Sequence, residues 1–429
     1  MKILSWEKDQ KDIKEIFAAR RSMEIEADVM NSVSEIVTAV KKEGEKAVKT
    51  YTEQFDGVKL DDLKVNTQEI KEARKKVSDD FLSSLQKSIS KVKDFHKRQL
   101  KNSWFNSEAG GLVGQKITPL QRIGAYVPGG RFPYPSSVVM TVVPAVAAGV
   151  QEIVVTTPPD ETGKVNPHIL TAAIEAGADE IYKVGGAQAV AALAYGTDNI
   201  ESVDKIVGPG NIYVTAAKKI VFGTVDIDML AGPSEILILA DETADPDYAA
   251  ADLLSQAEHD PRAVSVLVTT SSKLAKDVTA ALQKQLSELE NNQTAADSMK
   301  ENGMIITVPD INQGIDLVND FAPEHFELVV NEPFAYLGLI KNAGAIFIGE
   351  KASEPMGDYI AGPNHVLPTG GTGRFSSPLN TDDFIKKSSI IYYNKHGFAQ
   401  DGPDARRLAE LEGLEAHARA VAIRQENEK

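Results

Sequence analysis

The sequence has no cysteine, few histidines and no excess of positive charge, and each absence narrows the possible functions. Without cysteine, disulfides and thiolate metal ligands are excluded, so a metal site would need imidazole, carboxylate or carbonyl oxygen ligands. The 46 basic residues stand against 62 acidic ones, and the net charge of −16 argues against binding nucleic acid or an anionic membrane electrostatically. No run approaches about 18 consecutive apolar residues and no apolar signal core opens the chain, so we expect a cytoplasmic protein without a membrane span.

What the chain does contain is an alternation of two kinds of segment, which predicts its fold class. Up to about residue 104 the apolar spacing indicates mainly helix. From about residue 119, short β-rich runs such as "EIVVTTP" and "SEILILAD" alternate with stretches of helical length. Such alternation is typical of βαβ units and parallel sheets. We therefore predict an α/β fold with two Rossmann-like but incomplete modules, a helical N-terminal region and an extended C-terminal helical tail.

The two modules meet near residue 235, and this gives the expected domain bounds. Residues 1–21 form an N-terminal helical segment, and residues 22–118 together with 236–379 form the first α/β domain. The second α/β domain covers residues 119–235. Residues 380–429 form the tail, which reads as a linker followed by an amphipathic helix.

The stretch "LLSQAEHD" at residues 253–260 places Gln256 and His259 one helical turn apart. Asp245 and Pro246 begin the helix, and Pro261 stops it soon afterwards. The buried stripe consists of Ala250, Leu253, Leu254 and Ala257, whereas Asp252, Ser255, Gln256 and His259 fall outside it. From spacing alone, the pair is either a solvated surface or half of a metal site.

Other segments carry polar residues that could do chemistry, each with a plain structural alternative. Adjacent Glu324 and His325 could transfer protons near neutral pH, or form an ordinary loop ion pair. The long glycine-rich segment 354–379 carries Asp358 and His365, but its "GGTG" is weak evidence for a phosphate loop. Four further polar residues have an ordinary structural explanation, as hydrogen-bonding or solvent-exposed side chains: Ser234, Glu412, His417 and His96.

Nucleotide binding stays open from spacing alone. Glycine turns in "VPGGRFPYPSS", "VGGAQAV" and "VGPGNIYV" join strands to helices, but none matches the G-x-G-x-x-G pattern of a Rossmann dinucleotide site.

Taken together, these segments resemble the histidinol dehydrogenases. The matching runs lie between residues 122 and 421 in the order and spacing of that family: "RIGAYVPGG", "VGGAQAVAALAYGT", "KIVGPGNIYV", "DMLAGPSEILI", "DLLSQAEHDP", "FAPEHFEL", "GDYIAGPNHVLPTGGTGRFSSPL" and "EGLEAHARAV". The resemblance implies an NAD-dependent, zinc-dependent oxidation of L-histidinol through L-histidinal to L-histidine.

The resemblance also implies a role for each matching residue. The zinc ligands would be Gln256, His259, Asp358 and His417. The substrate contacts would be Ser234, Gln256, His259, His325, Asp358, His365, Glu412 and His417. The NAD contacts would be Tyr126, Gln188 and Asn211, which assigns NAD to the second α/β domain and the metal and catalytic residues to the first.

For the reaction itself, the resemblance implies that His325 takes the alcohol proton and Glu324 activates water for aldehyde hydration. It further implies one zinc ion per subunit and a homodimer in which the tail reaches the partner's site. Two alternative functions belong to other classes of protein: a zinc hydrolase that uses a metal-bound water, and a non-catalytic α/β protein that binds a small molecule.

Overall fold

The computed structural model describes residues 1–21, 25–108, 110–129 and 133–426. The chain divides into two compact units. The large unit comprises Met1–Gln99 and Leu120–Phe384, and the small unit comprises Leu100–Pro119 and Ile385–Lys429. Among the residues described, no helix has both the length and the apolar character needed to cross a membrane.

The first sheet of the large unit has six parallel strands in the order β1-β11-β10-β9-β12-β13. Their bounds are β1 Lys2–Ser5, β9 Glu235–Ala240, β10 Val264–Thr269, β11 Met304–Thr307, β12 His325–Val329 and β13 Ala345–Ile348. The strand order reverses at β9, because β10 and β11 lie on one side of it and β12 and β13 on the other. The expected parallel sheet is therefore confirmed.

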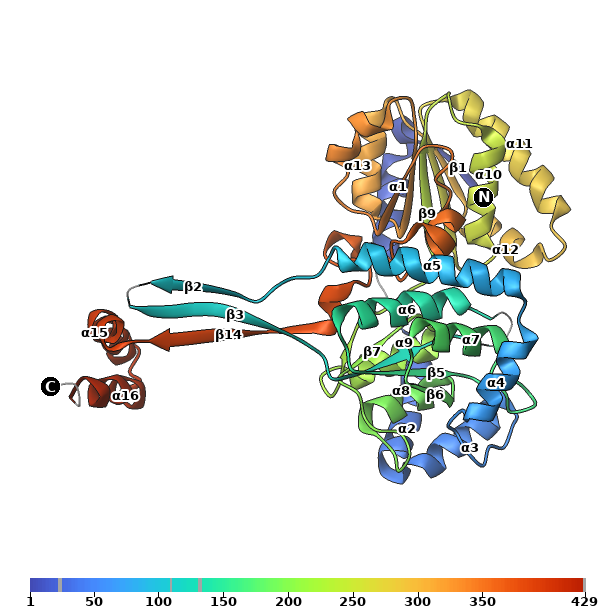
Figure 1. The fold of residues 1–429 in the computed structure, drawn as a ribbon. Coiled ribbons are helices and arrows are strands. Elements are labelled where there is room, and N and C mark those ends of the chain that lie inside the picture. The colour runs from blue at the N-terminus through green and yellow to red at the C-terminus, as the bar shows by residue number, and fades with distance from the viewer. Residues whose placement is uncertain (22–24, 109, 130–132, 427–429) are drawn as a thin grey trace. The chain divides into compact units, whose positions relative to one another are not determined.

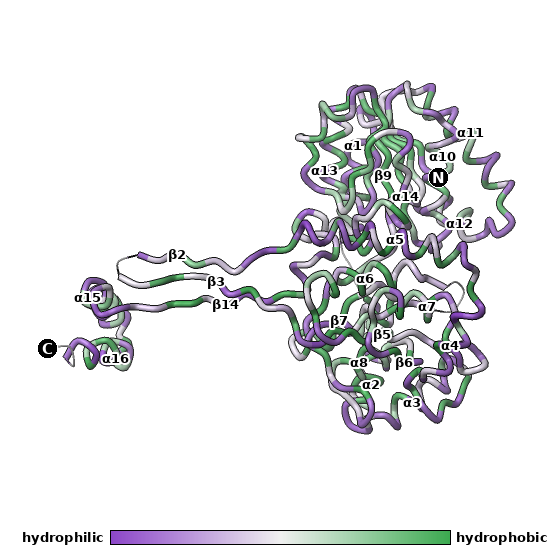
Figure 2. Tube along the Cα trace, in the orientation of Figure 1, coloured by the Kyte–Doolittle hydropathy of each residue, from purple (hydrophilic) through white to green (hydrophobic). Residues whose placement is uncertain are grey.

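Helices cover both faces of this sheet (Figure 1). Alternate residues of β9 belong to the apolar cores on its two sides. Ile236 and Ile238 pack with α10 Pro246–Ala257, α11 Ser272–Glu288 and α12 Gln293–Asn302. Leu237 and Leu239 pack with α1 Trp6–Arg20 and α13 Ile311–Phe321. Because both faces are covered, β9 is a continuous hydrophobic run, visible as green tube in Figure 2.

The second sheet has five parallel strands in the order β6-β5-β4-β7-β8. Their bounds are β4 Arg122–Tyr126, β5 Glu152–Thr157, β6 Glu180–Lys183, β7 Lys205–Val207 and β8 Asp226–Ile227. Helices α6 Pro135–Ala148 and α7 Pro167–Ala176 pack against each other, and α6 also packs on β4 and β5. The order reverses at β4, between β5 and β7.

The N-terminal helices pack with the second module, which differs from the grouping of residues 22–118 with the first. One apolar core joins α2 Ala27–Glu43 and α3 Glu45–Asp56 to α8 Gly186–Tyr195 and α9 Ile212–Val221. Helix α4 Thr67–Lys76 packs on α7. A helical spacing shows that one face is buried but not which sheet covers it.

Two further segments differ from the expected secondary structure. Residues 1–21 are not entirely helical, because β1 adds a parallel edge strand beside β11 before α1 begins. The small unit contains an antiparallel sheet in the order β14-β3-β2, with β2 Trp104–Glu108, β3 Gly111–Pro119 and β14 Ile385–Tyr393. Helices α15 Lys395–Leu411 and α16 Glu415–Glu426 follow and confirm the helical tail.

His96 was expected in solvent, and that expectation is wrong. It lies in α5 Asp79–Lys97, and its side chain is fully buried. Its Nδ1 lies 2.7 Å from the Val92 carbonyl, and its Nε2 lies 3.5 Å from Asn364 Nδ2. Burial lowers the pKa of His96. This histidine is part of the packing between α5 and the glycine-rich segment.

Candidate active site

The candidate site begins at the amino ends of β9 and β12, which are neighbouring parallel strands. Ser234 directly precedes β9, and Glu324 directly precedes β12. The Glu235 backbone N–H donates to Glu324 Oε2 at 2.9 Å, and His325 Nδ1 lies 3.1 Å from the Glu235 carbonyl oxygen. Open α/β sheets usually bind ligands beyond the carboxyl ends of their strands. In the first module, by contrast, Glu324 and His325 lie at the amino ends.

His325 is buried and has a defined orientation. A carbonyl oxygen can only accept, so Nδ1 carries the proton that is donated to Glu235, and in the neutral ring Nε2 has the free lone pair. Nε2 has no hydrogen-bond partner and lies 3.6 Å from Asp358 Oδ1. Burial alone would lower the pKa of His325, but the neighbouring carboxylates of Glu324, Asp358 and Glu354 outweigh it and raise that pKa to about 10.

Glu324 is equally enclosed, with 7% of its surface exposed. Burial raises the pKa of its carboxyl group to about 8, against the opposing effects of His325 and the Glu235 N–H group. A carboxyl group with a pKa near neutrality can both accept and release a proton under physiological conditions. Glu324 and His325 are therefore two adjacent buried titratable groups, with Nδ1 of His325 3.8 Å from Oε2 of Glu324.

Asp358 faces this pair from the glycine-rich segment. It lies in the helical turn η3 Gly357–Ala361, and Ser88 Oγ of α5 fixes this turn by donating to the Tyr359 carbonyl at 2.7 Å. Burial would raise the pKa of Asp358, but the nearby His325 and the charges of His365 and His259 lower it overall. The charge of Asp358 is therefore favoured by the three nearby imidazoles of His325, His365 and His259.

Gln256 and His259 lie at the end of α10, which Asp245 caps as expected, and His259 approaches the same cluster. Gln256 lies outside the apolar stripe of this helix but not in solvent: it is 1% exposed, and its Oε1 has no hydrogen-bond partner. His259 follows the helix with its side chain 38% exposed, and its Nε2 lies 3.9 Å from Glu354 Oε1. Burial lowers the pKa of His259, which favours the neutral ring that a metal requires.

These side chains fit a divalent cation. A buried amide oxygen without a partner is costly unless something else satisfies it. In addition, ligand atoms of His325, Glu354 and Asp358 lie within 4.8 Å of one another. Nitrogen and oxygen donors of this kind suit zinc, although an amide oxygen is an unusual ligand.

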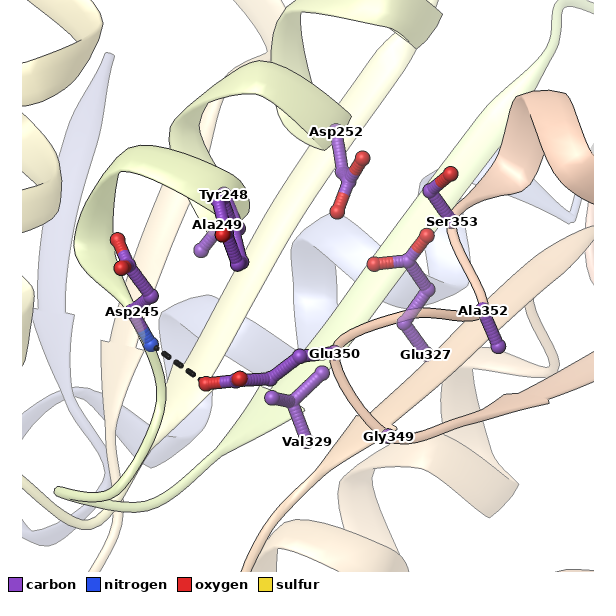
Figure 3. Close-up of a pocket in the computed structure, with 10 residues that line it drawn as sticks. All are labelled: Asp245, Tyr248, Ala249, Asp252, Glu327, Val329, Gly349, Glu350, Ala352 and Ser353. Carbon is purple, nitrogen blue, oxygen red and sulfur yellow. Dashed lines mark hydrogen bonds between the residues drawn. The ribbon is translucent and has the colours of Figure 1, made fainter.

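Glu354 is a member of the cluster that the sequence did not suggest. It is 2% exposed, and its Oε2 accepts from Ser255 Oγ at 3.0 Å. The residues behind it are also acidic: Glu327 accepts from the Glu354 backbone N–H at 3.1 Å, and its carboxyl group faces that of Asp252 (Figure 3). Burial and Asp252 raise the pKa of Glu327 to about 9, so this pair retains a proton at neutral pH.

A cavity of about 670 Å³ opens beside the cluster. Asp358 and His365 contribute to its lining, together with apolar side chains such as Ile346, Phe347 and Leu379. The Nε2 atom of His365 is buried without a hydrogen-bond partner. A small polar ligand would find both charged and apolar contacts here.

A second cluster lies at the carboxyl ends of the strands in the other module. Tyr126 ends β4, and its hydroxyl accepts from the backbone N–H of Gly186 at the start of α8, at 3.1 Å. Gln188, in the first turn of α8, is 1% exposed, and its Oε1 has no partner. Burial raises the pKa of Tyr126 to about 12, so its hydroxyl stays protonated.

Asn211 follows β7, the strand that pairs with β4 where the strand order reverses. It caps α9 through its side-chain oxygen, which accepts from the backbone N–H groups of Tyr213 and Val214. The preceding Gly208 has a φ of +113° and lies so close to β4 that a Cβ atom there would be 2.1 Å from the Tyr126 carbonyl oxygen. Doubly wound sheets commonly bind ligands beyond the carboxyl ends of the two strands at such a reversal, which here are β4 and β7.

Glu412 and His417 belong to the small unit. Glu412 follows α15, His417 lies in α16, and both side chains are exposed. The residues that the structure brings together are therefore those of the large unit, namely His259, Glu324, His325, Glu354 and Asp358. Gln256 lies near the end of α10, three residues before His259.

Comparison with known proteins gives a consistent result. The family model for histidinol dehydrogenase matches residues 19–425. A histidinol dehydrogenase of Halalkalibacterium halodurans is 51% identical over 419 residues, covering 97% of this chain and 99% of the relative. One from Geobacillus kaustophilus is 52% identical over 396 residues, covering 92% and 93%. The crystal structure of histidinol dehydrogenase from Elizabethkingia anophelis superposes with a TM-score of 0.94 at 38% identity, covering 100% of this chain and 98% of that one. The chain belongs to the histidinol dehydrogenase family.

Proposed function

We propose that this chain uses one zinc ion and NAD to oxidise L-histidinol to L-histidinal and then to L-histidine. Family membership makes the chain an oxidoreductase of histidine biosynthesis, so the proposal concerns the residues and cofactors that perform the reaction. The observation that carries it is the contact between a buried proton-transfer pair, Glu324 and His325, and a cluster of nitrogen and oxygen donors around Asp358.

Gln256, His259, Asp358 and His417 would hold the metal. Zinc bound there would fix the amine and imidazole of the substrate and, by neutralising Asp358, would lower the pKa of His325 toward the range in which imidazole accepts protons. Ser234, His365 and Glu412 would contact the substrate, together with His325 and the metal ligands. The unpartnered Oε1 of Gln256 and Nε2 of His365 support this assignment.

His325 would accept the hydroxyl proton of histidinol at Nε2 while the carbinol carbon gives its hydride to NAD⁺. Glu324 would then take a proton from water as that water adds to the aldehyde. His325 would return its proton to the former carbonyl oxygen, which yields a gem-diol and leaves His325 neutral again. Loss of a second hydride to another NAD⁺ and of a second proton to His325 leaves the carboxylic acid. The Glu235 carbonyl holds Nδ1, which keeps Nε2 available in both oxidations.

Tyr126, Gln188 and Asn211 would contact NAD in the crevice between β4 and β7. The reversal of strand order at β4 supports this position, as does the unpartnered Gln188 oxygen at the start of α8. The glycine turns here depart from the usual dinucleotide pattern, so recognition would depend on these side chains.

A homodimer would bring Glu412 and His417 of one copy to the site of the other. The small unit supports this proposal because it exposes many large apolar side chains, among them Trp104, Phe105, Ile391, Leu408 and Leu411. Apolar patches of this kind are typical of interfaces between subunits. The cytoplasmic location stays a prediction.

The test is a metal analysis paired with an assay of histidinol and NAD⁺, with and without a chelator. We expect one zinc per subunit, two NADH per histidinol, and loss of turnover on chelation that added zinc restores. A hydrolase would release product without forming NADH. A binding protein would bind histidinol without turnover.

A further inference from the structure

We propose that the partly buried Arg20 and the buried Glu235 form an ion pair that positions both Glu324 and His325 for the reaction. Neither residue is among those assigned to metal, substrate or NAD. The inference rests on the proposed function, because Glu324 and His325 are its proton-transfer groups.

The peptide groups of Glu235 contact both residues at once. Its N–H donates to Glu324 Oε2 at 2.9 Å, and its carbonyl accepts from His325 Nδ1 at 3.1 Å. The position of one residue at the start of β9 therefore decides where two proton-transfer groups lie. Glu235 is consequently a positioning residue, since its side chain acts through these two neighbours.

The Glu235 side chain is held firmly in place. It is 3% exposed, and its Oε1 pairs with Arg20 Nη2 and accepts from the Gly370 backbone N–H at 2.9 Å. The guanidinium carbon of Arg20 lies 3.7 Å from the centre of the Phe321 ring, and Phe321 packs edge-on against Phe17. Helix α1, strand β9 and the glycine-rich segment thus meet at a single carboxylate.

A charged carboxylate is an unusual choice for the first residue of a strand that is otherwise apolar and buried. Removing Arg20 would leave that charge buried without its cation, and the strand start would have to move toward water to relieve it. A displacement of about 1 Å at reacting groups can lower the rate about 100-fold. The ion pair therefore affects the reaction through geometry.

The neighbouring Arg21 offers a matched control. It ends the same helix and pairs with Asp320 through its Nη2, without contact to Glu235. We would compare Arg20→Gln, Glu235→Gln, the double variant, Arg20→Lys and Arg21→Gln. For each, kcat, KM for histidinol and NAD⁺, zinc content and amide hydrogen exchange at position 235 would be measured.

We expect kcat of Arg20→Gln to fall about 10- to 100-fold with little change in KM or zinc content. Arg20→Lys should recover part of the loss because it restores the charge. The double variant should be more active than Arg20→Gln, because no charge is left unpaired and the introduced amide oxygen can still accept from the Gly370 N–H. Arg21→Gln should keep the wild-type kcat, even where its melting temperature falls.

Equal kcat in Arg20→Gln and Arg21→Gln, or in Arg20→Gln and the wild type, would overturn the proposal. If the wild-type protein failed to oxidise histidinol, the proposed function would fail instead. Hydrogen exchange would still test the ion pair in that case, because the Glu235 N–H should exchange at least about tenfold faster in Arg20→Gln than in Arg21→Gln. Equal exchange in these two variants would also overturn it.

Discussion

Replacing Glu324 with glutamine should separate the two oxidations. The glutamine side chain is nearly isosteric with glutamate, and its amide oxygen can still accept from the Glu235 N–H. Only the capacity to take a proton is lost. We expect the first oxidation to stay within about threefold of wild type, and the step that depends on water to slow by about 10²- to 10⁴-fold, the usual contribution of a general base.

The stability change can be worked out from the same carboxyl group. Its folded pKa of about 8 exceeds the ordinary value of 4.5, so the folded state binds this proton more tightly and wild-type stability falls as pH rises from about 4.5 to 8. At pH 7 this penalty is about 3 kcal/mol at about 1.4 kcal/mol per unit. Glutamine removes it, but it also removes the attraction to His325. We therefore expect the free energy of unfolding to change by no more than about 2 kcal/mol, which leaves the variant folded.

The assay is a single turnover with enzyme in excess over histidinol and with excess NAD⁺. The wild type should form two NADH per histidinol, and Glu324→Gln should form one rapidly and the second very slowly. A carbonyl reagent should trap histidinal in the variant only. Equal slowing of both oxidations, or two rapid equivalents, would refute the assigned role of Glu324.

Three further changes test other parts of the account. His259→Asn should weaken zinc binding at least about 10-fold, measured by metal analysis after dialysis, and full zinc retention with full turnover would remove His259 from the ligand set. Asp56→Asn should raise the melting temperature at pH 8 but not at pH 4: burial raises the pKa of Asp56 to about 6, so stability falls as pH rises through 4 to 6, by about 1 kcal/mol after allowing for partial exposure. An equal change at both pH values would contradict this. Gly208→Ala should destabilise the fold by about 2 kcal/mol or more, because its Cβ would meet the Tyr126 carbonyl, and an unchanged denaturation midpoint would argue against that contact.

Local sequence signals predicted the parts of the fold whose residues are neighbours in the chain. Helix α10 begins at Pro246 after the Asp245 cap, and its apolar stripe is buried as expected. Strands such as β9 were found because a short apolar run between turn residues suits a strand covered on both faces.

The small unit could not be found in this way. Strand β14 pairs with β3, which lies about 270 residues earlier in the chain, and adjacent Lys386 and Lys387 interrupt the polar and apolar alternation. A strand that depends on a distant partner leaves little local signal.

The candidate site was predicted mainly through resemblance, because spacing alone left each motif open. Glu354 and Glu235 were missed since their importance comes from contacts between distant segments: Glu354 meets His259, and Glu235 meets Glu324 and His325. One signal was available. A charged residue within or beside an apolar buried strand, such as Glu235 or Glu327, must be paired or protonated, and is therefore a candidate for part of a site.

The most direct test is anomalous diffraction at the zinc edge from crystals of the zinc-loaded protein. We predict a single metal peak per subunit, at about 2.0–2.2 Å from oxygen or nitrogen atoms of Gln256, His259, Asp358 and, from a second copy, His417. A peak elsewhere, or His417 distant from the metal in every copy of the crystal, would contradict the account.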